Sequence, residues 1–124
     1  MTDVAYKIVA TEEWRAALAE GVYAGSAADL ADGYIHMSTE AQLAETARRH
    51  YAGRDDLMLL TVDLTALGDD LVWEPSRGGQ LFPHLYGALP VGAVVAIDPL
   101  PLGPDGRHRF PQTVADDTRS NDGN

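Results

Sequence analysis

The sequence predicts an α+β domain with small mixed or antiparallel sheets and two or three helices. Two observations favour this class: strand patterns outnumber helix patterns late in the chain, and the regular strand–helix alternation of a doubly wound sheet is missing. The length of 124 residues, 45% of them hydrophobic, suffices for one core. We therefore expect a single domain over residues 1–111 and a disordered acidic tail over residues 112–124.

The first third of the chain predicts a strand and two helices. Residues 4–9 alternate and contain β-branched side chains, which is typical of a strand. Thr11 is expected to cap a helix that stops at Gly21. Residues 25–30 form a loop that feeds one short helical turn, and Gly33 ends it. The side chains expected on the apolar face of the first helix are Trp14, Ala17, Leu18 and Val22.

The middle of the chain predicts a further helix between strands. Residues 34–38 form a short strand, and Thr39 to Gln42 has the capping-box spacing of a helix start. Leu43 and Ala47 share the buried side of that helix, which closes by Gly53. Residues 57–63 are apolar on both faces, so we expect a central strand there.

Two more strands are expected before the tail. Residues 71–74 form one, with Trp73 on its core side and Glu74 on the other. Residues 91–97 form the last, which Asp98-Pro99 ends.

Composition narrows the function classes. The net charge is −10, so we expect no nucleic-acid partner, since such proteins carry basic patches. The favoured interpretation of the basic clusters 48–49 and 107–109 is solvated surface. The chain has no cysteine, no basic start followed by a long apolar run, and no apolar run of membrane-spanning length. We therefore expect a soluble cytoplasmic protein without a disulfide or a membrane partner.

The stretch from Trp73 to Gly87 carries an unusual density of chemistry. It combines a carboxylate, a hydroxyl, a guanidinium, an imidazole and a phenol with several turn-forming residues. Loops and strand ends of this type line pockets, because flanking elements hold their side chains still. The candidate site residues in this stretch are Glu74, Ser76, Arg77, His84 and Tyr86.

Residues 34–38 are a second segment predicted to line the pocket and would form its other wall. With strand alternation, Ile35 and Met37 face the core, and Tyr34, His36 and Ser38 face the other way. Three polar-capable side chains on one face suit a strand that lines a cleft. The alternative interpretation is a solvent face with an incidental histidine, because Ser38 can also serve simply as a helix cap.

Two catalytic alternatives have weaker support. His36, His84 and Glu74 are ligand types that suit zinc or iron, but no spacing prepositions two of them, and we expect no metal site. The sequence also lacks the G-x-S-x-G turn of a serine hydrolase.

Several motifs over residues 4–98 together resemble the bacterial domain-of-unknown-function 952 family. They are Tyr6-Lys7-Ile8, Gly21-x-Tyr23-x-Gly25-Ser26, Asp32-Gly33-Tyr34-Ile35-His36-Met37-Ser38-Thr39, Gln42-Leu43, Trp73-Glu74-x-Ser76 and Phe82-Pro83-His84-Leu85-Tyr86-Gly87. The resemblance implies a relative of the ADP-ribosyltransferase fold, in which two small splayed sheets bind NAD in the cleft between them. By that template His36 matches the cleft histidine, Tyr34 or Tyr86 the stacking ring, and Glu74 the acid.

Three hypotheses follow. The first is an enzyme acting on NAD or another small anionic metabolite, with a cleft that holds both imidazoles. The second is a non-catalytic binding module or accessory protein that uses the same cleft. The third is that buried hydrogen bonds of these motifs only maintain the fold. For the enzyme, the expected catalytic residues are His36, Glu74 and His84, and the expected substrate-binding residues are Tyr34, Ser38, Ser76, Arg77 and Tyr86.

Overall fold

The computed structural model describes residues 3–111 and Val114, and within them it confirms an α+β fold with three α-helices and small antiparallel sheets. The helices are α1 (Thr11–Glu20), α2 (Ala27–Asp32) and α3 (Glu40–His50). The strands are β1 (Val4–Ala10), β2 (Val22–Tyr23), β3 (Ile35–His36), β4 (Leu57–Asp63), β5 (Leu71–Pro75), β6 (Leu81–Leu85), β7 (Leu89–Pro90) and β8 (Val94–Pro99). Short 3-10 turns occupy Leu64–Ala66, Gly68–Asp70, Arg77–Gly79 and Val91–Ala93.

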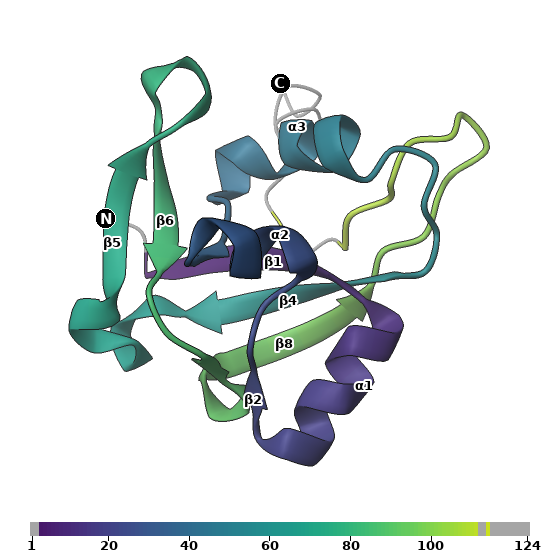
Figure 1. Cartoon of the computed structure of the whole chain (residues 1–124). Helices are drawn as coiled ribbons and strands as arrows, with labels where there is room; N and C mark the ends of the chain where they lie inside the picture. The colour runs from purple at the N-terminus through teal and green to yellow at the C-terminus, as the bar shows by residue number, and fades with distance from the viewer. Residues whose placement is uncertain (1–2, 112–113, 115–124) are drawn as a thin grey trace.

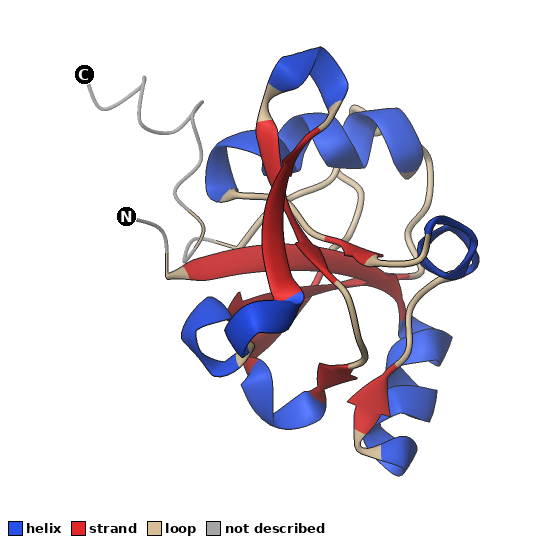
Figure 2. Ribbon diagram, turned by 60° about the vertical axis from the view of Figure 1, so that its left-hand side comes forward, coloured by secondary structure: helices blue, strands red, loops and turns tan. Residues whose placement is uncertain are grey.

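The strands form three sheets. In the largest, β4 lies between β1 and β8, as its two apolar faces predicted. In the second, β6 lies between β3 and β5, and the third pairs β2 with β7. The β5–β6 hairpin runs across the direction of β1 and β4 (Figures 1 and 2).

The segment that follows β3 joins the two larger sheets. Met37 still donates its backbone N–H to the carbonyl of Pro83, which lies in β6. One residue later, Ser38 exchanges two backbone hydrogen bonds with Tyr6 of β1, at 2.8 and 2.9 Å. The chain therefore leaves one sheet and enters the other within two residues, which holds the sheets at an angle.

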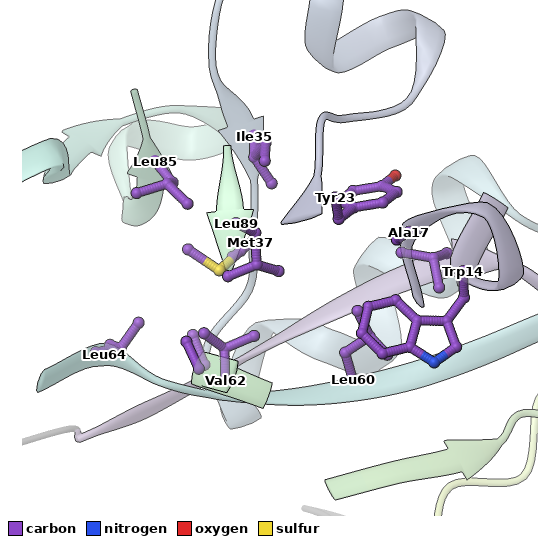
Figure 3. Packing of buried hydrophobic residues seen from close by; sticks show 13 residues of the cluster. Trp14, Ala17, Tyr23, Ile35, Met37, Leu60, Val62, Leu64, Leu85 and Leu89 are labelled. Atoms are coloured by element: carbon purple, nitrogen blue, oxygen red, sulfur yellow. The ribbon is translucent and has the colours of Figure 1, made fainter. Parts of the chain in front are cut away.

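The hydrophobic core has two clusters. The larger fills the space between β4 and the β3–β6 region, with α1 closing one side through Trp14 and Ala17 (Figure 3). The second lies beneath α3 and includes Leu43 and Ala47, as predicted from the helix spacing. Ile35 and Met37 are buried in the first cluster, which confirms the predicted core face of that segment.

Several local predictions are wrong. The Thr11 side chain does not cap α1 but donates to the carbonyl of Asp56 at 3.0 Å, and Ala10 occupies the N-cap position. Leu18 and Val22 are exposed, because β4 receives only the face of α1 that carries Trp14 and Ala17.

The later strands also differ from expectation. Trp73 is 37% exposed, since the hairpin that carries it projects beyond the larger core. The last strand begins at Val94, because residues 91–93 form a 3-10 turn.

The C-terminal part is described only in part. Most of the predicted tail lies outside the described residues, but Val114 is buried in the cluster beneath α3. His108, whose basic neighbours predicted solvated surface, is instead nearly buried, and its Nε2 lies 2.7 Å from the carbonyl oxygen of Arg54.

An ion pair between Lys7 and Asp29 fastens α2 to β1. Lys7 Nζ lies 2.9 Å from one Asp29 carboxylate oxygen and 3.1 Å from the other, and both side chains are buried. The same carboxylate accepts the backbone N–H groups of Ser26 at 2.9 Å and His36 at 3.1 Å. It therefore ties β1, the start of α2 and β3 to one point.

The surroundings of Asp29 keep it ionised. Burial alone raises the pKa of Asp29, but the hydrogen bond from His36 and the ion pair with Lys7 outweigh this and hold that pKa well below its ordinary value. Burial also lowers the pKa of the Lys7 ammonium, and the adjacent carboxylate of Asp29 opposes that effect.

We expect Asp29→Asn to lower the free energy of unfolding by about 3 kcal/mol at about pH 7, because it leaves the buried Lys7 without its counter-ion. The pKa of Asp29 is lower in the folded state than its ordinary value of 3.8. The stability that the ionised carboxylate contributes is therefore complete above that ordinary pKa and is lost as pH falls through the folded-state pKa. In urea unfolding, the difference between the wild type and the variant should shrink toward about pH 3. Asp32→Asn, on an exposed side chain, is the control. A difference independent of pH would contradict this account.

Gly25→Ala should lower the melting temperature by at least about 4 °C, equivalent to roughly 1 kcal/mol or more in a domain of this size. The φ of Gly25 is 117°, and a Cβ there would stand 2.9 Å from the Cβ of Asp29. Gly92→Ala is the matched control, because a Cβ at that position meets nothing within 4 Å. Equal effects of the two changes in thermal unfolding would show that the space beside Asp29 does not matter.

Candidate functional site

The two candidate histidines lie opposite each other on neighbouring strands. His36 of β3 and His84 of β6 are cross-strand partners, and their ring centroids are 5.7 Å apart. The ring of Tyr34 stacks on His84 at 4.1 Å between centroids and lies 4.6 Å from His36. Antiparallel pairing places such partners on one face of a sheet, so the two predicted walls meet here.

A carboxylate holds the ring of His84. Glu74 Oε1 lies 2.7 Å from His84 Nδ1, and the hydroxyl of Tyr86 donates to both oxygens of Glu74, at 2.8 and 3.1 Å. The hydrogen bonds from His84 and then Tyr86 lower the pKa of Glu74, and the bond to Glu74 raises the pKa of Tyr86. A carboxylate at Nδ1 leaves Nε2 as the ring nitrogen that can meet a ligand.

His36 is held by carboxylates on both sides. Its Nδ1 lies 2.5 Å from Asp29 Oδ1, and its Nε2 lies 2.9 Å from Asp32 Oδ2. Both nitrogens donate at once only in the protonated ring, so this arrangement suits an imidazolium. Asp29 is buried whereas Asp32 is exposed, so only the Asp32 contact lies where a ligand or solvent can replace it.

Both imidazoles line a pocket of about 680 Å³. This volume lies within the roughly 300–1,000 Å³ of typical small-molecule sites. Of the predicted substrate-binding residues, Ser38 and Ser76 also line it. Ser38 is buried, and its hydroxyl lies 2.8 Å from the Thr46 hydroxyl of α3, so it also links the segment after β3 to the helix.

Three other predicted site residues, Glu74, Tyr86 and Tyr34, do not line this pocket. Glu74 is connected to the site by its hydrogen bond with His84, and Tyr86 by the hydrogen bond that it donates to Glu74. Tyr34 borders a separate cavity of about 180 Å³ and reaches the site through its ring contacts. The side chain of Arg77 lies outside the part of the chain that the structure describes.

Sequence reasoning missed the residues that hold His36. Asp29 lies 22 residues from Lys7 and 7 from His36, and no local pattern pairs them. The available signal was the capping-box spacing of Ser26 and Asp29, which explains one role of this carboxylate but not its burial beside an ammonium.

Neither a metal centre nor a membrane span was found in the described residues. Within 3–111 and Val114, no three His, Cys, Asp or Glu side chains are grouped so as to hold a metal ion. Over the same part of the chain, no helix has the length and apolar character to cross a bilayer.

Comparison with known proteins agrees with the motifs. Residues 8–97 match the model of a family described as "Protein of unknown function (DUF952)". The crystal structure of protein CC0527 from Caulobacter crescentus is 46% identical in sequence, with a TM-score of 0.86 over 90% of this chain and 98% of that one. The solution structure of the same protein gives a TM-score of 0.81 over 92% of this chain and 98% of that one. None of the curated proteins matches the sequence. The protein accordingly belongs to the DUF952 family of unknown function.

Proposed function

We propose that the protein is an enzyme that performs acid–base chemistry on a small anionic metabolite in the pocket of His36 and His84. One observation carries this proposal: two imidazoles lie on facing strands at the wall of one pocket, and each is tied to a carboxylate. Imidazole is the side chain whose ordinary pKa lies nearest to neutral pH, which suits a general acid or base.

The two imidazoles have different roles in this proposal. Glu74 fixes the ring of His84 through Nδ1 and directs Nε2 toward the ligand, as a carboxylate does in other acid–base pairs. His36, held between Asp29 and Asp32, serves as proton donor, because its two contacts suit the protonated ring. His84, which Glu74 contacts at Nδ1, then accepts a proton at Nε2.

NAD is the first candidate substrate, with ADP-ribosyl transfer as the reaction. The bond between ribose C1′ and nicotinamide breaks, neutral nicotinamide leaves without taking up a proton, and an acceptor hydroxyl or water that loses its proton to His84 bonds to C1′. In this reaction His36 orients the ribose, and its role as proton donor applies to other metabolites.

The support for NAD is the ADP-ribosyltransferase-like fold that the resemblance to the family implies. Tyr34 and Tyr86, whose ring centroids are 5.2 Å apart, form an aromatic group beside the pocket. Such rings offer a face to a planar base. Ser38 and Ser76 supply hydroxyl groups at the pocket wall.

Titration with NAD tests this assignment by amide NMR shifts in the full chain. We expect millimolar NAD to shift residues around Ser38, Ser76 and His84, and His84→Ala to abolish product formation while the spectrum stays folded. Shifts with other phosphorylated metabolites but none with NAD would remove NAD as the substrate. A ligand that binds without ever being converted would make the protein a binding module, and a pocket that binds no metabolite would overturn the function.

The pairing of His84 with Glu74 has a test of its own. Because the hydrogen bond from His84 lowers the pKa of Glu74, His84→Ala should raise the pKa of that carboxyl toward its ordinary value of 4.5. Tyr86→Phe removes the hydrogen bonding from the Tyr86 hydroxyl and should raise the pKa of Glu74 less than His84→Ala does. Carboxyl carbon NMR shifts over an acid titration measure both changes. An unchanged titration of Glu74 in the His84 variant would show that the pair does not form in solution.

A further inference from the structure

The pocket concentrates basic side chains in an acidic protein. The sequence has nine Lys and Arg, four His and nineteen Asp and Glu. Among the described residues that line the pocket are three of those Lys and Arg, three of the His and three of the Asp and Glu. The basic members are Lys7, His36, Arg49, His50, Arg54 and His84, and the acidic members are Glu13, Asp29 and Asp32. With the histidines neutral, the three cationic and three acidic side chains of the lining balance, whereas the whole sequence has a net charge of −10. The pocket is therefore less repulsive to an anionic ligand than the rest of the protein.

The pocket extends along α3 from the imidazoles to a basic end. Ser38 and Tyr51 both line the pocket. Ser38 precedes α3 by two residues, and Tyr51 follows the last residue of the helix. Eleven helical residues span about 16 Å at 1.5 Å per residue. Figure 1 shows α3 running from the side of the β5–β6 hairpin toward the loop that precedes β4. A ligand that fills the pocket is therefore elongated, with its two ends in different surroundings.

The basic end is made by Arg49, His50 and Arg54. Arg49 directs its Nε to Glu45 at 2.7 Å, and Arg54 directs Nε and Nη2 to Asp56 at 3.1 and 2.9 Å. A guanidinium has five N–H donors, so both side chains retain donors for a ligand while keeping these ion pairs. Glu45 and Asp56 do not line the pocket, but Glu13 does, and its charge acts on Arg54. Two guanidinium groups therefore share this end of the pocket with one carboxylate.

A purely local explanation covers only part of this cluster. Basic residues in the last turn of a helix stabilise it through the helix dipole, and Arg48, Arg49 and His50 all occupy that turn of α3. Arg54 lies beyond the helix and still lines the pocket, with its guanidinium 5.8 Å from the centre of the Tyr51 ring. Arg48 belongs to the same turn and does not line the pocket. A place in the last turn of α3 therefore does not by itself put a basic side chain at the pocket.

We propose that Arg49, His50 and Arg54 form a subsite for a phosphate group of the substrate. The reacting part of the same molecule then lies against His36 and His84, which makes the substrate class an elongated phosphorylated metabolite. Arginine suits this role because its planar fork matches the oxygens of a phosphate. The inference rests on the proposed function for the reacting end, but the phosphate subsite itself requires no reaction.

Inorganic phosphate and pyrophosphate are the probes for this subsite, with the full chain followed by amide NMR at low ionic strength. We expect saturable shifts at residues 49–54 and a loss of affinity of at least about tenfold in the double variant Arg49→Gln/Arg54→Gln, the size of one or two charge-assisted hydrogen bonds. The single variants Arg49→Gln and Arg48→Gln give the charge-matched comparison, since both remove one arginine from the same turn and the same Glu45, and only Arg49 lines the pocket. Thermal unfolding checks that all variants remain folded.

The outcomes separate the subsite from the proposed function. Absent shifts, or an equal loss of affinity in Arg48→Gln and Arg49→Gln, would overturn the subsite and show only a diffuse attraction to surface charge. Phosphate binding at residues 49–54 without turnover of any phosphorylated metabolite would keep the subsite and overturn the enzyme. Turnover that is unaffected by Arg49→Gln/Arg54→Gln would keep the enzyme and overturn the subsite.

Discussion

The buried carboxylate of Asp29 is the contact on which the site depends. It receives the ammonium of Lys7 from β1, the backbone of Ser26 at the start of α2, and both the backbone and the ring of His36 from β3. A carboxylate that is buried away from water is stable only if its oxygens accept hydrogen bonds or pair with a cation, and these groups supply both. The requirement to satisfy one buried charge therefore fixes α2 on the sheet and sets the orientation of His36 at the pocket.

The second constraint is the change of partner after β3. The segment pairs with β6 at His36 and with β1 at Ser38, so the two larger sheets cannot continue into one another. The space that this angle leaves beside α3 becomes the pocket, and the register of β3 with β6 places both imidazoles on its wall. The candidate site is thus a consequence of sheet geometry, and the last turn of α3 together with Arg54 supplies its basic end.

Local sequence patterns predicted much of this arrangement. Alternation in residues 34–38 correctly assigned Ile35 and Met37 to the core, because one face of a strand must be buried. The capping-box spacing at Thr39 and Gln42 correctly located the start of α3, because it satisfies free N–H groups there. Alternation with Glu74 assigned Trp73 wrongly to the core side, since exposure depends on what packs against the hairpin.

The sequence by itself determined the α+β class, most element positions, and the two segments that carry the site. Each of these follows from spacings within one element. Only the tertiary structure decided that Lys7 neutralises Asp29, that His36 lies opposite His84, and that Arg49 and Arg54 share a pocket with them. Those facts join residues from different elements. Strand register and the burial of charge come from packing between elements, which local periodicity does not encode.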